Sequence, residues 1–293
     1  MSALQIKKVL GVGKKSDAHI IKLISCLRFK SCKSMETSSI PVKTFMADKL
    51  SVRVFATQEE LAIDAALAAQ RCLQEAIVAK GSAAIIFACA TSQMKFLEAL
   101  AKLAGIDWSR ITVFHMDEYL GISSEHQASF RRFLRERVIQ YVRPRICYYL
   151  EGDALLPLDE CERYTQLLKH QPIDLCCLGI GENGHIAFND PDVANFHDPR
   201  MVKLVKLDVK CRQQQVGEGF FPHLPAVPQY AMTLTIPALC AAQRMLCIVP
   251  DQRKAQAVKD TLQKPVSTAC PASILRQQSH ATLFLDAASA SLL

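Results

Sequence analysis

The segment 179–191, with the sequence GIGENGHIAFNDP, carries the densest group of side chains able to move protons. Glycines before His185 allow the backbone to turn sharply, so we expect the imidazole ring to point into a pocket. Asp190 follows five residues later and can fold back to this ring. A neutral imidazole oriented by a carboxylate is a general base at about pH 7, whereas a surface loop with a satisfied histidine is the alternative.

The same segment contains the letters G-x-G-x-x-G, which are typical of loops that bind dinucleotides. Such a loop also opens a helix and is followed about 20 residues later by an acidic residue, a place that Asp208 could take. However, Asn189-Asp190-Pro191 ends a helix almost at once, and too few residues remain before the next expected strand for a crossover helix. The segment therefore argues against NAD binding.

Two adjacent carboxylates, Asp117 and Glu118, leave the strand expected at 111–116. Solubility does not explain both, because one of them must face the interior, where an uncompensated carboxylate is costly. One interpretation is a proton-abstracting carboxylate with a pKa tuned by partial burial. The other is a helix N-cap with a salt bridge, and the pair by itself supports both equally.

Hydroxyl and amino groups suited to an anion stand at the start of two expected helices. Thr91 and Ser92 precede one of them, where backbone N–H groups and two hydroxyls would cradle an anion, although N-capping is the commoner role. Lys254 falls in the first turn of a helix that starts at Asp251. Because a cation there is unfavourable for the helix dipole, its position favours an anionic partner.

Strand-like and helix-like patterns alternate from Leu50 onward and position these residues. Thr57–Glu60 is a capping box that opens a helix extending to about Val78. Strands are expected at 51–56, 83–88, 111–116, 173–180, 202–207, 231–236, 244–249 and 281–286, with helices at 92–104, 126–139 and 158–170 and after Asp251. This pattern predicts an α/β fold, a doubly wound, mostly parallel sheet with helices on both faces in a single domain. Ligands of such sheets bind outside the carboxyl ends of the strands, where the polar residues lie.

The composition is that of a globular chain, with 293 residues, 50% hydrophobic and 22% charged, which excludes disorder and collagen-like repeats. Residues 1–45 hold nine of the 35 basic and two of the 28 acidic residues, so residues 46–293 hold 26 of each. The net charge of +7 therefore belongs to the N-terminal segment. A neutral body argues against a nucleic-acid partner and predicts a small ligand.

We predict that residues 1–45 form a poorly ordered basic extension and that residues 46–293 form one domain. Three interpretations of this extension remain open: a transit peptide, a disordered leader, or upstream sequence translated from the wrong start, with Met46 as the true one. The twelve cysteines include no C-x-x-C pair and lie mostly in apolar runs, which predicts buried thiols in a reducing compartment. No apolar run reaches the roughly 18 residues that cross a bilayer, so we expect a cytoplasmic protein without a membrane partner.

Taken together, these loops resemble the glucosamine-6-phosphate deaminase/isomerase family, which is related to the 6-phosphogluconolactonases. The matching stretches cover most of 46–293 in the family's order, at 114–122, 174–191, 229–258 and 270–286, and GENGHIAFNDP is specific. The resemblance implies conversion of glucosamine 6-phosphate and water to fructose 6-phosphate and ammonia in amino-sugar catabolism. It implies no cofactor and no metal, a sugar phosphate as the partner, and is compatible with a homo-oligomer.

The resemblance also implies a role for four residues in proton transfer. His185 would open the pyranose ring, and Asp117 would abstract the C2 proton and return it at C1. Asp190 stands where the family usually has a glutamate that orients the histidine. Asn183, where some members carry aspartate, would act as a hydrogen-bonding group.

For the substrate phosphate, the resemblance implies binding by Lys254, Thr91 and Ser92. Two positions depart from the family's pattern. Ala90 replaces a glycine of the phosphate loop, which restricts access to positive φ, and Gly219 replaces an arginine that precedes a Phe-Phe pair. Arg212 is a candidate substitute for that arginine.

Two alternatives remain open on the same residues. A relative on the same scaffold would act on another sugar phosphate or hydrolyse 6-phosphogluconolactone, which does not require Asp117 as a carbon base. A non-catalytic sugar-phosphate sensor would bind its ligand without exchanging the C2 proton with solvent.

Overall fold

A computed structural model describes residues 39–293, and the expectations for residues 1–38 fall outside that range. Strand β1 (Lys43–Ala47) pairs antiparallel with β2 (Leu50–Phe55), so the first strand of the described residues begins three residues before the predicted domain boundary at residue 46. The sequence did not predict β1 because it is an edge strand whose side chains are mostly exposed and show no apolar alternation.

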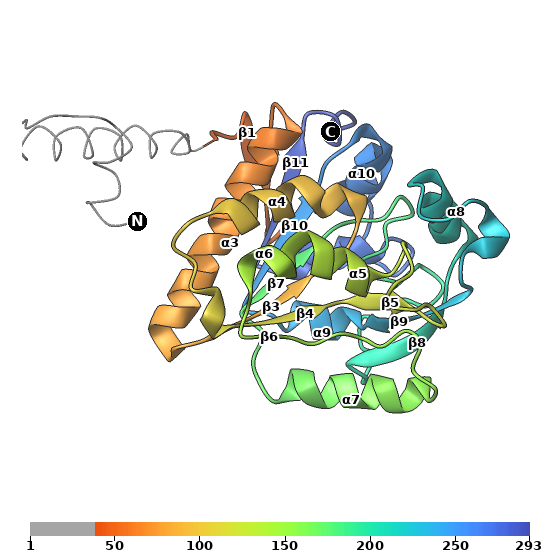
Figure 1. The fold of residues 1–293 in the computed structure, drawn as a ribbon. Helices are drawn as coiled ribbons and strands as arrows, with labels where there is room; N and C mark the ends of the chain where they lie inside the picture. Colours follow the sequence, from red (N-terminus) through yellow and green to blue (C-terminus); the bar gives the residue numbers. More distant parts are fainter. Residues whose placement is uncertain (1–38) are drawn as a thin grey trace, which may run out of the picture. The chain divides into compact units, whose positions relative to one another are not determined.

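An eight-stranded sheet forms the centre of the fold, in the order β1-β2-β11-β10-β7-β3-β4-β6 (Figure 1). Every neighbouring pair except β1–β2 is parallel. The remaining strands are β3 (Ala83–Phe87), β4 (Ile111–His115), β6 (Ile146–Cys147), β7 (Leu175–Leu178), β10 (Arg244–Val249) and β11 (Ala281–Asp286). The predicted α/β fold with a mostly parallel sheet is confirmed.

Helices cover both faces of this sheet, and each face has its own hydrophobic core. Cys176 faces the core that includes Tyr164 of α7 (Pro157–Lys169) and Val258 of α10 (Ala255–Gln263). Its neighbour Cys177 faces the other core, which is built with α3 (Gln58–Lys80) and α4 (Met94–Lys102). Successive residues of a strand point to opposite faces, which explains why the central strands are apolar throughout.

The predicted capping box is present at the start of α3. The Thr57 hydroxyl accepts a hydrogen bond from the Glu60 N–H at 3.2 Å, and the Glu60 carboxylate accepts one from the Thr57 N–H at 3.0 Å. The helix ends at Lys80, and the next residue, Gly81, caps it with a φ of 79°, the left-handed conformation that favours glycine.

A second, antiparallel sheet corrects the predicted topology. The segments expected as strands at 202–207 and 231–236 are β8 (Val202–Lys206) and β9 (Tyr230–Leu234), and they pair with each other and with β5 (Asp117–Tyr119) in the order β5-β9-β8. They do not join the main sheet. Apolar periodicity identifies a strand but not its partner, so the sequence could not separate the two sheets.

The helix expected at 126–139 is also different. It begins at Phe130, because the Ser129 hydroxyl caps it, and runs as α5 (Phe130–Leu134), a π-helical turn (Arg135–Ile139) and α6 (Gln140–Val142). The other helices are α8 (Val209–Gly217), α9 (Ile236–Cys240) and short 3₁₀ turns at Thr91–Gln93, Trp108–Arg110, Leu224–Ala226, Gln252–Lys254 and Pro271–Gln277.

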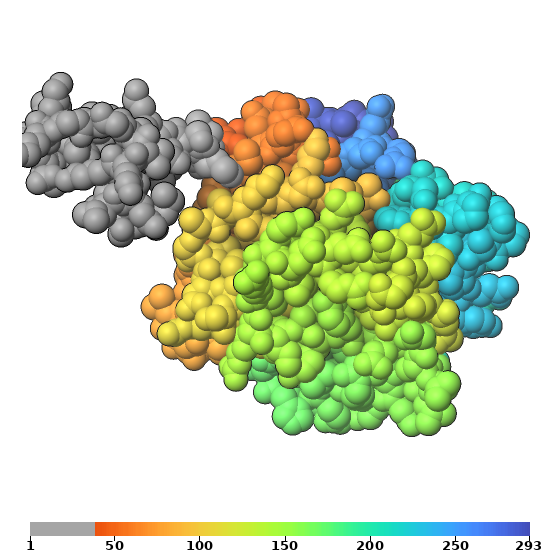
Figure 2. All heavy atoms as spheres, in the orientation of Figure 1, coloured from red at the N-terminus to blue at the C-terminus, as the bar shows by residue number. Residues whose placement is uncertain are grey.

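Ten cysteines lie within residues 39–293; all are free thiols and seven are buried, as expected from their apolar surroundings. Among the helices of this range, none combines the length and the apolar character that a membrane span requires. The cyan segment that includes α8 lies at the rim of the face shown in Figure 2.

Candidate active site

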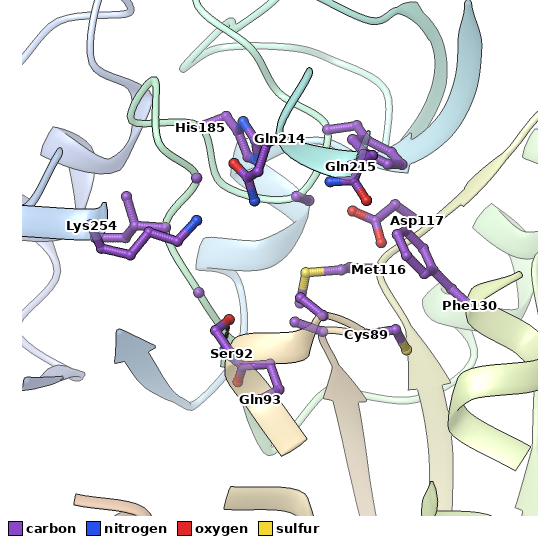
Figure 3. Close-up of a pocket in the computed structure, with 17 residues that line it drawn as sticks. Cys89, Ser92, Gln93, Met116, Asp117, Phe130, His185, Gln214, Gln215 and Lys254 are labelled. Atoms are coloured by element: carbon purple, nitrogen blue, oxygen red, sulfur yellow. Dashed lines mark hydrogen bonds between the residues drawn. The ribbon is translucent and has the colours of Figure 1, made fainter. Parts of the chain in front are cut away.

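A pocket lies at the carboxyl edge of β3, β4 and β7, where α8 and the Gln252–Lys254 turn also reach it (Figure 3). Four of the residues predicted from the sequence line it: Ser92, Asp117, His185 and Lys254. They converge because parallel neighbouring strands end at the same edge of the sheet. Apolar side chains, including Met116 and Phe130, complete the wall.

The two adjacent acids are both buried, but their surroundings differ. Glu118 is fully inaccessible and accepts hydrogen bonds from the N–H groups of Tyr119, Phe130 and Arg131 at 3.0–3.2 Å and from the Ser129 hydroxyl at 2.7 Å. Glu118 therefore joins β5 to the start of α5, which is the capping role considered for the pair.

The carboxylate of Asp117, by contrast, faces the pocket (Figure 3), as the interpretation of a proton-abstracting carboxylate requires. Burial raises the pKa of Asp117 well above its ordinary value, and the neighbouring charge of Glu118 raises it further. A carboxylate with a raised pKa is a stronger base when ionised, and this one stands where a ligand could reach it.

Replacing Glu118 with alanine is expected to destabilise the fold. The change would remove the carboxylate 3.4 Å from Nε of the buried Arg131 and leave three N–H groups without their acceptor. We expect the free energy of unfolding to fall by about 3–5 kcal/mol in chemical denaturation. Glu125→Ala is the control, because its exposed ion pair with Arg135 contributes at most about 1 kcal/mol. Equal losses for the two variants would contradict the prediction.

His185 is held by two residues behind it. Its Nδ1 lies 2.7 Å from Oδ1 of Asn183 and 2.9 Å from Oδ1 of Asp190. Both atoms are acceptors, so Nδ1 carries the proton of the neutral ring and Nε2 is left as the basic nitrogen. The predicted fold-back of Asp190 onto the ring is what the geometry shows.

Asp190 is itself held in place. Its Oδ1 accepts a hydrogen bond from the Asn183 amide at 3.0 Å, and its Oδ2 accepts one from the Asp208 N–H at 3.0 Å. Burial acts to raise the pKa of Asp190, but the hydrogen bonds from His185 and Asn183 outweigh it and keep the pKa below its ordinary value. Asp190 therefore stays ionised beside the ring. Asp208 caps α8 with its side chain, a role unrelated to a dinucleotide.

Gly181 makes room for the imidazole. A Cβ atom at this position would lie 2.2–2.4 Å from three ring atoms of His185, closer than any real contact. Gly184 has a φ of 83°, and a Cβ there would meet the sulfur of Cys270 at 2.8 Å. Gly181 thus allows the close approach of the ring, and Gly184 allows the turn that orients it. These roles explain the glycines without a bound pyrophosphate.

Gly181→Ala is therefore expected to displace the ring. If the ring acts on a substrate, we expect the kcat of that reaction to fall by about tenfold or more, since small misplacements of a reacting group are costly. Gly217→Ala is the matched control, because a Cβ there meets nothing within 4 Å. Steady-state kinetics on both variants, with circular dichroism to verify folding, would test this, and unchanged kcat in Gly181→Ala would show that the ring tolerates displacement.

The cation at the other end of the pocket is Lys254, which is 4% exposed and points into the cavity (Figure 3). Burial lowers its pKa, and the charges of Glu218 and Glu182 act in the opposite direction. Within residues 39–293 no carboxylate lies within ion-pair distance of its ammonium group. The ammonium is therefore available to an anionic ligand.

The turn after β3 differs from expectation in two respects. Ala90 has φ −140° and ψ 159°, an extended conformation that any residue adopts, so the alanine introduces no strain. Neither hydroxyl caps α4, whose N-cap is Gln93. Ser92 lines the pocket, but Thr91 lies in an adjoining outer pocket, where its hydroxyl donates a hydrogen bond to Glu218 at 3.0 Å.

Arg212 does not take the place of the arginine that Gly219 replaces. Its guanidinium donates hydrogen bonds to the carbonyls of Leu224 and Val227, both at 2.8 Å, and Arg212 does not line the pocket. This corrects the interpretation of Arg212 as a ligand-binding residue. It holds the turn that follows α8.

Sequence reasoning missed Gln214 and Gln215, which α8 places in the pocket (Figure 3). The Gln215 side-chain oxygen accepts a hydrogen bond from the Tyr119 hydroxyl at 2.7 Å, and that of Gln214 accepts one from the Glu182 N–H at 3.1 Å. Uncharged amides carry no chemical signature, and the only available signal was the run CRQQQ in a polar helix.

One set of donor atoms within residues 39–293 could hold a metal ion. His185, Asp190 and Cys211 each place one ligand atom within 4.8 Å of the others. However, Nδ1 of the histidine and both oxygens of the aspartate already take part in the hydrogen bonds described above. In the described chain, His185 and Asp190 are therefore committed to these hydrogen bonds rather than free to hold a metal ion.

The chain is similar to known proteins of one family. Residues 56–284 match the family model of glucosamine-6-phosphate isomerases/6-phosphogluconolactonase. The glucosamine-6-phosphate deaminase of Lactobacillus delbrueckii subsp. bulgaricus is 35% identical over 188 residues, which are 64% of this chain and 78% of the relative. That of Bacillus cereus is 32% identical over 243 residues, which are 83% of this chain and 89% of the relative.

Solved structures of related proteins have the same fold as this chain. A monomeric glucosamine-6-phosphate deaminase superposes with a TM-score of 0.77 at 30% identity, covering 83% of this chain and 99% of that one. A 6-phosphogluconolactonase from Shewanella baltica has a TM-score of 0.68 at 18% identity, covering 83% of this chain and 100% of that one, and shares the fold. The chain therefore belongs to the family of glucosamine-6-phosphate isomerases and 6-phosphogluconolactonases.

Proposed function

We propose that this chain converts glucosamine 6-phosphate and water to fructose 6-phosphate and ammonia, in amino-sugar catabolism. The observation that supports it most directly is one pocket that holds Asp117, His185 and Lys254. Asp117 supplies a base that can remove a proton from carbon, His185 a second acid/base group, and Lys254 a cation that can bind the phosphate. Proton movements at different atoms of the sugar need separate groups, and the pocket has them. The free thiols support a reducing compartment such as the cytoplasm.

The first step assigned to the pocket is ring opening by His185. Its Nε2 takes the proton of the O1 hydroxyl and returns it to the ring oxygen, so that the pyranose opens to the aldehyde. Asp190 and Asn183 hold the Nδ1 proton throughout, because both accept from that nitrogen. The imidazolium that forms transiently is stabilised by the ionised Asp190.

The second step belongs to Asp117. Its ionised carboxylate removes the proton from C2 while O1 takes a proton from solvent, which leaves an enolamine, and it then returns the C2 proton to C1. The protonated imine that forms at C2 gives a proton back to solvent. The product is an imine at C2, and addition of water there releases ammonia and leaves the ketone of fructose 6-phosphate. Hydrogen bonds occupy the carboxylate of Glu118, so Asp117 is the acid of the pair that can take part.

The phosphate is assigned to Lys254, with Ser92 and the outer Thr91 as hydroxyl donors. Lys254→Met is expected to raise KM for the sugar phosphate by about 10–100-fold, because a charge-assisted hydrogen bond is lost. The lowered pKa of Lys254 also predicts a pH dependence. As pH rises, Lys254 loses its charge at a lower pH than an ordinary lysine does, and phosphate affinity should fall with it. Lys102→Met, an exposed change on α4, is the control. A KM equal to wild type in Lys254→Met would remove this residue from the phosphate site.

The experiment that tests the proposal is ammonia release by the purified full-length chain supplied with glucosamine 6-phosphate. Folded protein that releases no ammonia at millimolar substrate would overturn it. Hydrolysis of 6-phosphogluconolactone, measured in parallel, tests the alternative that shares this fold. Binding of the sugar phosphate without exchange of its C2 proton for solvent deuterium would instead identify a sensor.

A further inference from the structure

Glu218 directs its carboxylate at the turn after β3. It follows the last residue of α8, and its Oε2 accepts the hydrogen bond from the Thr91 hydroxyl at 3.0 Å. Its Oε1 accepts a second hydrogen bond from the side-chain amide of Gln214 at 2.7 Å. Both carboxylate oxygens thus have partners. One of them is a hydroxyl that the proposed function assigns to the substrate phosphate.

The charge of Glu218 also acts on the ammonium group of Lys254. Both side chains line the outer pocket, together with Thr91 and Ser92. Among the charges that oppose the lowering of the Lys254 pKa by burial, that of Glu218 is the largest. A phosphate held between Thr91 and Lys254 would meet this carboxylate, and two anions in a partly desolvated site repel each other.

The chain around Glu218 leaves room for the side chain to move away. Gly217 and Gly219 flank it, and a Cβ atom at either position would meet no atom within 4 Å. Gly219 has a φ of 81°, and Glu218 itself is half-buried. Both flanking glycines are exposed, so the carboxylate can turn outward toward solvent.

We propose that Glu218 is a built-in competitor for the phosphate of the substrate. In the free protein its carboxylate occupies the Thr91 hydroxyl and shares the outer pocket with Lys254, without an ion pair to the ammonium group. A phosphate dianion displaces it by accepting from the Thr91 hydroxyl and pairing with that ammonium group. Glu218 is therefore a specificity-determining residue that sets the affinity for the phosphate group. The inference rests on the proposed function, because it uses the same anion site.

Two variants test the inference, Glu218→Gln, which removes only the charge, and Glu218→Ala, which also removes the contact with Thr91. Titration calorimetry with inorganic phosphate on the full-length chain should give dissociation constants lower than wild type by about 3–10-fold. KM for glucosamine 6-phosphate should fall by a similar factor. The gain should shrink as salt rises to about 0.5 M, since screening weakens the repulsion.

Glu98→Gln is the matched control, because Glu98 lines the same outer pocket without a hydrogen bond to Thr91. Phosphate affinity that is unchanged or weaker in both Glu218 variants would overturn the inference, as would a gain of equal size in Glu98→Gln. If wild type releases no ammonia while Glu218→Gln binds phosphate more tightly, the proposed function fails and the inference stands. If wild type releases ammonia but neither Glu218 variant gains phosphate affinity, the proposed function stands and the inference fails. Circular dichroism on each variant verifies folding.

Discussion

Asp117→Asn is expected to lower kcat for ammonia release by about 10²–10⁴-fold, the usual contribution of a positioned general base. Asparagine keeps the shape of the side chain but cannot take the proton from C2. KM should change little, because the phosphate contacts are made elsewhere. Exchange of the C2 proton with solvent deuterium should be lost in parallel, which nuclear magnetic resonance measures directly.

Asp192→Asn is the matched control, since this aspartate is exposed and lies outside the pocket. A 6-phosphogluconolactonase would not need Asp117 as a carbon base, so lactone hydrolysis should survive Asp117→Asn if the chain has that activity. Ammonia release within tenfold of wild type would contradict the assignment of Asp117. Loss of both activities in a folded variant would point to a general role in binding.

The raised pKa of Asp117 also predicts how the activity of the wild type depends on pH. Burial, followed by the charge of Glu118, favours the protonated carboxyl, so the base becomes available only as pH rises through a pKa well above the ordinary value for aspartate. The acid limb of the kcat/KM profile of the wild type should therefore lie above about pH 4. An acid limb at the ordinary aspartate value would contradict the raised pKa.

His185→Asn is the second large effect that we expect, again about 10²–10⁴-fold in kcat. The asparagine amide can still donate to Asp190, as Nδ1 of the histidine does at 2.9 Å, but the variant has no counterpart of Nε2. Ring opening then depends on the spontaneous reaction, so ammonia release should be slow while the C2 chemistry at Asp117 is intact.

His197→Asn is the control, because His197 is exposed and follows the same loop. The decisive comparison uses a substrate that is already open or cannot close its ring, on which His185→Asn should recover most of its rate. A variant that is equally slow on both substrates would show that His185 acts in a later step. Wild-type rates on the cyclic substrate would remove His185 from the mechanism.

The sequence alone determined the features that depend on local patterns. Strands such as 83–87 and 244–249 are apolar on both faces because helices cover both sides of a parallel sheet, and that pattern is visible in the letters. The capping box at Thr57 and the return of Asp190 to His185 are contacts over three and five residues. Short-range contacts of this kind follow from residue type and spacing.

Only the tertiary structure decided what each polar residue does with its hydrogen bonds. It separated Asp117 from Glu118, because the groups that satisfy Glu118 include Ser129 and Arg131, more than ten residues away. It tied Arg212 to the carbonyls of Leu224 and Val227, and placed Gln214 and Gln215 in the pocket.

The same holds for the second sheet. Its strand β5 has the sequence DEY, which shows no apolar pattern, and it pairs with β9 across more than 100 residues of chain. The physical reason is common to these cases. A residue type limits the partners that a side chain can accept, but the partner is chosen by which segments the fold brings together, and segments this far apart in the chain leave no periodic trace in the sequence.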